Sequence, residues 1–259
     1  MKKNIFALMM GTMAIALTFS SCKKDDDDEE IITPVATTGT VKLEMEHTFG
    51  DEEFALGTAY TTGSGESVTF NTTKYYVSNV QFHKADGTTW SQPESYYLVN
   101  LEADGSNILD ITGVPTGDYT DVTFTIGVDS TRNVSGAQTG ALSIANAMFW
   151  TWNSGYIMIK LEGDCPQSSN GSFAYHLGGF YGANSSVNTG TFSFDPAILS
   201  VSPSATPQIH MAVDIKQFFD NPDHVHTVAM GSNITMPGAM AATLADNFFS
   251  GIEFEHIHN

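Results

Sequence analysis

Short stretches of alternating apolar and polar side chains limit how this 259-residue chain can fold more than any other feature. Val41, Leu43 and Met45 alternate with polar residues, and residues 122–129 repeat the pattern. A period of two residues is typical of a β-strand that has one face buried and one face in water. Further short stretches with strand character lie at residues 76–82, 96–101, 156–161, 172–177, 192–194, 208–215 and 251–258.

Helical periodicity is scarce in this sequence. Residues 141–148 are a candidate for one short helix, and residues 237–249 are a better one, because three apolar residues recur there every four positions. Pro237 suits the first turn of that helix, and Gly251 lies just beyond its end. Many short strands, glycine-rich turns and few helices predict an all-β fold, an antiparallel β-sandwich with one or two short helices.

Residues 1–21 have the pattern of a bacterial lipoprotein signal peptide. Lys2 and Lys3 precede an uncharged stretch from Ile5 to Phe19, and small residues lead up to Cys22. The uncharged stretch is shorter than the roughly 20 residues that a membrane-spanning helix needs. The segment resembles a lipobox, so we expect Cys22 to become the lipidated first residue of the mature chain. An ordinary cleaved signal with a free cysteine is the alternative.

Residues 22–38 predict a charged linker. After Cys22, two lysines are followed by four aspartates and two glutamates, and a block of like charges stays extended and solvated. One interpretation of this block is a plain spacer. The other is that it is similar to the export signal of Bacteroidetes lipoproteins, which directs display on the cell surface. We therefore expect the chain at the cell outer membrane, held by its lipid anchor and exposed at the cell surface.

The predicted sandwich domain, residues 39–259, is strongly acidic. The chain has 10 basic and 29 acidic residues, and four and six of these precede residue 39, which leaves the domain a net charge of −17. Such a domain is a poor partner for nucleic acid but attracts cations. Apart from Cys22 the chain has only Cys165, so we expect no disulfide inside the domain.

Motifs of the common enzyme classes are missing from the sequence. It contains no P-loop, dinucleotide-binding fingerprint, nucleophile elbow or zinc-protease helix motif. Aspartate and glutamate are abundant, but none lies in a recognisable catalytic arrangement, which leaves a hydrolase as the weakest alternative. We therefore expect a binding protein and not an enzyme.

The eight histidines are the candidate metal ligands, because imidazole is the commonest protein ligand for copper and zinc. Two pairs stand two residues apart, His224 with His226 and His256 with His258. On a strand, residues at this spacing point to the same side, so each pair could chelate one ion. A loop accounts equally for the first pair, and a packed or fraying strand end accounts equally for the second.

Two single histidines are also candidates. His47 continues the apolar face of the first predicted strand, where a hydrogen-bonded core histidine is the alternative. His176 lies out of phase with the apolar residues around it and precedes Gly178 and Gly179. Glycine leaves room for a ligand or another chain segment to approach closely.

The densest aromatic stretch, residues 147–156, contains Trp150 and Trp152. Composition alone favours a core or interface cluster. Extended to residues 148–163 and joined by His176-Leu177-Gly178-Gly179, however, the stretch resembles the MbnP-like copper-binding family. Shorter pieces carry the resemblance over roughly residues 40–255, and these pieces lie at residues 74–80, 124–129 and 244–248.

The resemblance implies a β-sandwich that binds copper through histidines and a tryptophan that a dihaem peroxidase-type partner oxidises to kynurenine. An indole N–H can only donate, whereas the aromatic amine of kynurenine has a lone pair for a metal. By this resemblance Trp150 or Trp152 is the modified residue, with Trp150 favoured. His176 and His47 are the implied imidazole ligands, in that order.

The predicted function is a surface or periplasm-facing lipoprotein that binds copper for acquisition or sequestration. The alternative is a non-metal surface module that binds a glycan or a protein. In that case aromatic side chains would form a stacking platform, and the candidates are Tyr75, Tyr76, Trp90, Tyr96 and Tyr97.

Overall fold

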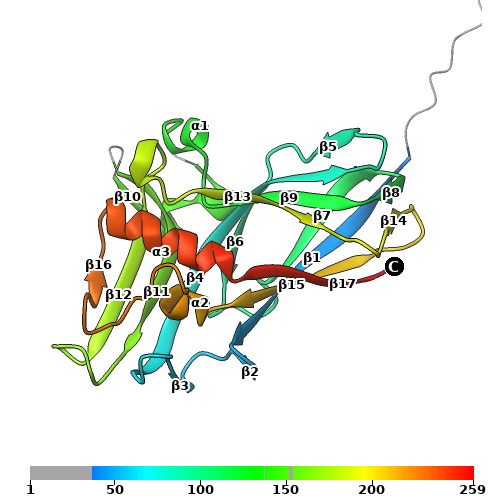
Figure 1. The fold of residues 1–259 in the computed structure, drawn as a ribbon. Coiled ribbons are helices and arrows are strands. Elements are labelled where there is room, and N and C mark those ends of the chain that lie inside the picture. Colours follow the sequence, from blue (N-terminus) through cyan, green and yellow to red (C-terminus); the bar gives the residue numbers. More distant parts are fainter. Residues whose placement is uncertain (1–36, 137, 152–153) are drawn as a thin grey trace, which may run out of the picture. The chain divides into compact units, whose positions relative to one another are not determined.

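The computed structural model describes residues 37–136, 138–151 and 154–259, and their strands form two large sheets and one short pair (Figure 1). This arrangement confirms the predicted all-β, sandwich-like class. The predicted signal peptide, Cys22 and the linker up to residue 36 lie outside the described residues.

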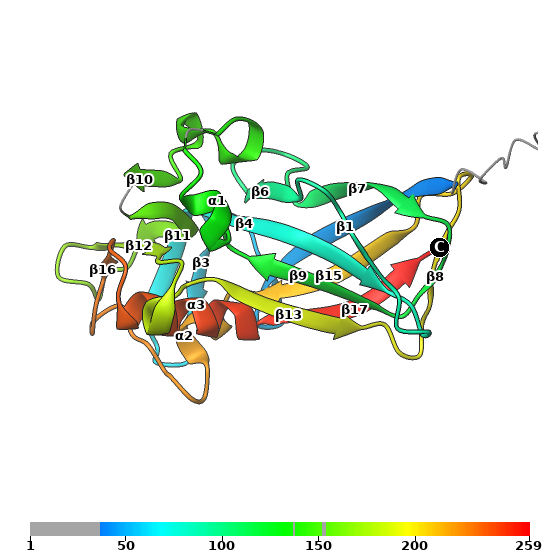
Figure 2. The same ribbon diagram turned by 90° about the horizontal axis from the view of Figure 1, so that it is seen from above.

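The five-stranded sheet contains both the first and the last strand of the described chain. Its members are β1 (Thr38–Phe49), β2 (Glu52–Glu53), β7 (Ile108–Pro115), β15 (Gln208–Asp214) and β17 (Ile252–His258). The order is β17, β15, β1 and β2, with β7 also paired to β1. The β1–β15 pair is parallel, unlike the antiparallel pairing that the sequence predicted, and the β15–β17 pair is antiparallel. Figure 2 shows β17 running beside β15 toward the end at which β1 begins.

The ten-stranded sheet is built around one long strand, β4 (Ser67–His83). Its order is β13 (Asn188–Ser193), β9 (Asp121–Ile126), β4, β11 (Gly155–Asp164), β12 (Ser172–Gly178) and β16 (Asn233–Ile234). Four short strands pair with these members, namely β3 (Ala59–Thr61), β5 (Thr89–Ser91), β6 (Tyr96–Asn100) and β10 (Phe149–Thr151). A separate short pair consists of β8 (Gly117–Tyr119) and β14 (Leu199–Val201).

Alternation along β1 decides which side chains reach the core. Val41, Leu43 and Met45 are fully buried, so the intervening Glu44 and Glu46 point to the outer face of the five-stranded sheet. The same alternation on β15 buries its odd-numbered residues and leaves its even-numbered ones on the outer face. Parallel pairing of β1 with β15 then aligns the two polar rows side by side.

One helix is longer than a single turn among the described residues. α3 (Ala239–Ser250) confirms the helix predicted at residues 237–249, and it packs on β12 and on the short helix α2 (Gln217–Asp220). The remaining helical turns are α1 (Ser130–Asn133), η1 (Gly140–Leu142), η2 (Ile144–Asn146) and η3 (Gly182–Asn184). Within the part of the chain that the structure describes, no helix is both long and apolar enough to cross a membrane.

The helix predicted at residues 141–148 is wrong, because two separate 3₁₀ turns occupy that stretch. Ser143 adopts an extended backbone between them and caps the second turn with its side chain. Ala147 then takes a left-handed conformation with φ of 56°, which ends the turn before β10. Serine favours such local caps over a helix interior, which is why the apolar pattern failed here.

Candidate functional site

An open pocket of about 740 Å³ lies along one edge of β1. It sits between the end of the β1–β7 pairing at Glu44 and the start of the β1–β2 pairing at Thr48. Its lining includes four acidic residues, Glu44, Glu46, Glu53 and Asp104, together with apolar residues. The pocket is therefore large enough for a small ligand and favours positive charge.

His47 lines this pocket from β1. Its Nε2 atom lies 2.8 Å from the hydroxyl oxygen of Tyr75, and the two rings meet edge to face. Burial lowers the pKa of the His47 ring from 6.5 to about 4, so the ring is neutral at pH 7. Burial also raises the pKa of Tyr75, which keeps the phenol protonated. In the tautomer whose Nε2–H donates to the Tyr75 hydroxyl, the neutral ring keeps its lone pair on Nδ1, where a ligand can bind.

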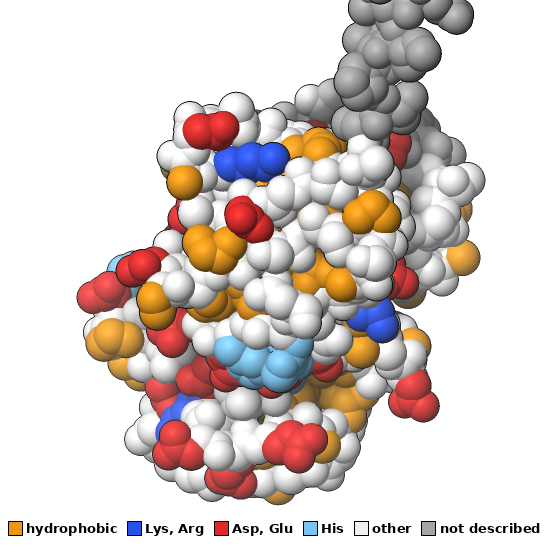
Figure 3. Space-filling model, turned by 90° about the vertical axis from the view of Figure 1, so that its right-hand side faces the viewer, with side chains coloured by type: hydrophobic (Ala, Val, Ile, Leu, Met, Phe, Trp, Pro, Cys, Tyr) orange, Lys and Arg blue, Asp and Glu red, His pale blue; other side chains and the backbone are white. Residues whose placement is uncertain are grey.

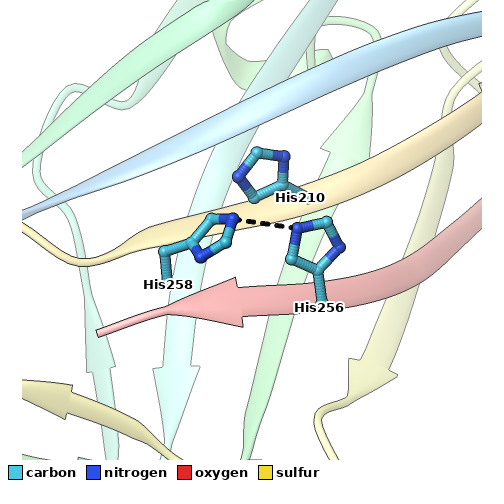
Figure 4. A group of neighbouring side chains, drawn as sticks. All are labelled: His210, His256 and His258. Atoms are coloured by element: carbon cyan, nitrogen blue, oxygen red, sulfur yellow. Dashed lines mark hydrogen bonds between the residues drawn. The ribbon is translucent and has the colours of Figure 1, made fainter.

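Three histidines meet on the outer face of the five-stranded sheet (Figure 4). His210 comes from β15, and His256 and His258 come from β17, which pairs with it. The Nε2 atoms of His256 and His258 are 3.2 Å apart. The His210 ring stacks on His256 at 4.2 Å between centroids and meets the His258 ring edge to face at 5.0 Å. One nitrogen from each of the three rings lies within 4.8 Å of the others. We call these residues the three-histidine cluster.

His210 lies beneath the other two rings and is only 8% exposed. Its Nδ1 atom is hydrogen-bonded to Glu46 and lies 3.7 Å from a carboxylate oxygen of Glu44. Its Nε2 atom is buried and has no hydrogen-bond partner among the described residues. Figure 3 shows histidine side chains gathered on the surface with acidic side chains around them.

His176 lies on the outer face of the ten-stranded sheet. Its neighbours on β12, Tyr175 and Leu177, are fully buried, so its own side chain points the other way. There its Nε2 atom lies 2.6 Å from a carboxylate oxygen of Glu162. The same oxygen forms an ion pair with Lys160, whose Nζ atom lies 3.4 Å away. Hydrogen bonding to His176 and the charge of Lys160 lower the pKa of Glu162. Burial acts on that carboxyl in the opposite sense and is the largest single influence on it.

Trp150 lies on the same face as His176. A Cβ atom at Gly178, two positions after His176 on β12, would come within 2.4 Å of the Trp150 ring, so the ring rests on that glycine. His47 instead contacts Tyr75, which is buried on the inner side of the same sheet. The structure therefore groups Trp150 with His176 and places the sheet between them and His47. Trp152 lies outside the described residues.

The remaining predicted pair, His224 and His226, divides between two environments. His226 is buried and bonds through Nε2 to the hydroxyl of Tyr175 at 3.0 Å and to the carbonyl of Gly231 at 3.1 Å. Burial lowers its pKa. His224 is exposed in the preceding loop. Among the described residues, neither ring belongs to a cluster of three or more side chains that could bind one metal ion.

The aromatic platform of the alternative function is only partly at the surface. Tyr75 and Tyr76 are fully buried in the core, so neither is available to stack on a ligand. Trp90 is half-buried and stacks on Phe82 with 6.1 Å between ring centroids. The prediction that Tyr75 and Tyr76 are exposed is therefore wrong. Both follow the strand pattern of β4, whose central part is covered on both faces.

Three residues at the three-histidine cluster were not singled out by the sequence, namely His210, which was only one of the eight histidines, and the glutamates Glu44 and Glu46. Each belongs to an alternating strand, so each was predictable as an outward-facing residue. What brings them together is the parallel β1–β15 pairing, which matches Glu44 with His210 at the same register position. A local pattern carries no signal for that pairing.

Comparisons with known proteins agree with this architecture. The family model named MbnP matches residues 38–237. A solved structure, MbnP from Methylosinus trichosporium, superposes with a TM-score of 0.51 at 12% sequence identity, covering 80% of this chain and 87% of that one. At such low identity the likeness is one of fold. No curated protein matches the chain by sequence. Because the family model spans most of the sandwich, the chain belongs to the MbnP family.

Proposed function

We propose that this chain is a copper-binding lipoprotein that acquires or sequesters copper at the cell surface. Membership of the MbnP family and the acidic domain support this proposal. The observation that carries it is the neutral imidazole of His47 in the wall of an acidic pocket. The protein would bind copper without catalytic turnover.

The residues of the pocket suit a copper ion. Imidazole nitrogen is a favoured copper ligand, and a ring that stays unprotonated down to about pH 4 does not have to lose a proton first. Tyr75 holds the ring in place, as hydrogen-bonded partners of metal-binding histidines commonly do. Acidic residues, Glu44, Glu46 and Glu53, line the same pocket, so negative charge that favours a cation is close by.

The proposal includes oxidation of Trp150 to kynurenine by a dihaem peroxidase-type partner. An intact indole cannot donate a lone pair to a metal, whereas the amine of kynurenine can. Trp150 lies on the same face of β12 as His176, so these two residues would act together. Since the sheet separates them from His47, we propose that the two groups bind separately and not around a single ion.

Metal analysis and peptide mass spectrometry of natively produced protein test this function. We expect bound copper, loss of one copper equivalent in His47→Ala, and a peptide containing Trp150 with the mass of kynurenine. His224→Ala serves as the control, because that histidine is exposed and away from the pocket, and its copper content should equal that of the wild type.

Each part of the proposal can fail separately. Natively produced protein with neither copper nor the modified tryptophan would overturn the function. Copper that persists unchanged in folded His47→Ala, checked by circular dichroism, would remove His47 from the site. Unmodified tryptophan in copper-loaded protein would remove the kynurenine.

A further inference from the structure

We propose that the three-histidine cluster is a further metal centre, in which His210, His256 and His258 bind one borderline divalent cation, Cu²⁺ or Zn²⁺. This centre lies on the outer face of the five-stranded sheet and does not use His47. It goes beyond the proposed function, and it stands or falls independently of copper binding in the pocket.

The fold itself holds the two outer histidines in position. His256 pairs with His210 and His258 pairs with Gln208, and an irregularity in the β15–β17 register follows directly after His210. Beyond the last histidine, the side chain of Asn259 accepts a hydrogen bond from the backbone of Ser200 at 2.9 Å and donates one to the carbonyl of residue 198 at 2.9 Å. The end of β17 is therefore anchored on β14, as a preformed site requires.

The spacing of the two outer nitrogens matches that of metal ligands. In a tetrahedral site with metal–nitrogen distances of about 2.0–2.1 Å, neighbouring ligand nitrogens stand about 3.3 Å apart. The Nε2 atoms of His256 and His258 are 3.2 Å apart. Both nitrogens cannot carry a proton at this distance, because one of the two must accept. A cation between them would use both lone pairs at once.

His210 supplies the independent evidence for a ligand. Glu46 accepts a hydrogen bond at Nδ1, which puts the ring proton on that nitrogen and leaves the lone pair on Nε2. That Nε2 atom is buried without a partner among the described residues, although buried polar atoms are nearly always satisfied. A bound metal ion would satisfy it. The carboxylate–histidine arrangement is the one that orients metal-binding imidazoles in proteins.

The surrounding charge favours a cation and the donor set selects its type. Glu44 lies 3.7 Å from His210 Nδ1 and is itself held by the side-chain amides of Gln208 and Asn107. Three imidazoles suit copper and zinc, whereas calcium and magnesium prefer oxygen ligands. Cu²⁺ binds nitrogen sites more tightly than Zn²⁺, so we expect that order of affinity.

Titration of the metal-free full chain with Cu²⁺ and with Zn²⁺ tests the centre. Because His256 and His258 are exposed, the double variant His256→Ala/His258→Ala should stay folded. We expect it to lose one equivalent of bound metal, while His224→Ala keeps the wild-type stoichiometry. In His47→Ala the centre should remain. Electron paramagnetic resonance of Cu²⁺ bound to that variant should show coupling to imidazole nitrogens, and this coupling should be lost in His47→Ala/His256→Ala/His258→Ala.

Glu46→Gln tests the orienting role separately. Removal of such a partner weakens metal affinity by about 10–100-fold and leaves the stoichiometry unchanged. Wild-type stoichiometry and affinity in the double variant would overturn this further centre. Loss of all bound metal in His47→Ala alone would also overturn the centre at the three-histidine cluster, and it would support metal binding in the pocket of His47. Loss in the double variant with no effect of His47→Ala would support the centre and contradict the pocket.

Discussion

At the scale of single residues, burial sorts the histidines of this chain into different chemical roles. His47 and His226 are held neutral by burial, and each bonds to a buried tyrosine hydroxyl. His210 is equally covered but bonds to a carboxylate and keeps an unpartnered nitrogen. The sequence shows only the residue type and its phase on a strand, whereas the partner of each ring depends on tertiary packing.

His226 should make folding stability depend on pH. Burial lowers its folded pKa below the usual 6.5, so the unfolded chain takes up a proton first as the pH falls. The stabilisation is therefore full above about pH 6.5 and declines below it. We expect His226→Gln to weaken the pH dependence of the unfolding free energy, measured with urea, below about pH 6.5.

The matched control for this titration is His224→Gln. His224 is exposed two residues earlier, so its replacement should leave the pH dependence of the wild type unchanged. Parallel pH profiles for the wild type and both variants would show that His226 does not contribute.

At the scale of elements, α3 closes one end of the sandwich through a single apolar face. Leu244 and Phe248 are buried on that face, and the ring of Phe248 lies 5.1 Å from the ring of Tyr75. Tyr75 in turn holds His47, so the helix supports the pocket through two aromatic contacts in series. The packing of α3 therefore affects the position of His47, the proposed copper ligand.

Leu244→Ala should destabilise the fold by about 2–5 kcal/mol, because it removes fully buried methyl groups and leaves a cavity. Chemical denaturation with urea measures this loss. Met240→Ala on the same helix is the control, since Met240 is 50% exposed and surface changes usually stay within about 0.5 kcal/mol. Equal effects of the two substitutions would contradict this account of the helix face.

Strands and the main helix were predictable because their signals are local. Residues 41–46, 122–126 and 208–214 alternate, and each lies in a strand of the structure, while the four-residue repeat at residues 237–249 forms α3. The Asp86-Gly87 turn also connects β4 to β5 as its type suggests. Pairing was not predictable, because a strand's alternation gives its faces but not its neighbours. The spacing of His256 and His258 therefore marked them as a pair, while their meeting with His210, Glu44 and Glu46 was found only through the sheet order.

At the scale of the whole molecule, acidic residues connect two of the proposed metal positions, the pocket of His47 and the three-histidine cluster. Glu44 and Glu46 line the pocket of His47 and also contact His210 of the three-histidine cluster. With a domain net charge of −17, cations are drawn to this region, and the two positions would share part of the same negative charge.

The proposed lipid anchor makes a prediction about location. Cys22→Ser should move the protein from the membrane fraction to the soluble fraction, because the thiol that carries the lipid is lost. Cell fractionation with immunoblotting measures this. Cys165→Ser is the control, since Cys165 is buried in the domain, and it should stay with the membrane. Membrane association of the Cys22 variant would rule out the anchor.

The strand order β1, β15, β17 also sets when a metal can be captured. Glu46 and His210 stand 164 residues apart, and the other two histidines follow later still. A ribosome completes these elements in sequence, so the three-histidine cluster cannot exist until β17 has emerged and paired with β15. A chain exported before it folds would therefore leave the cytoplasm without a finished site, and would first meet its metal in the compartment where it works.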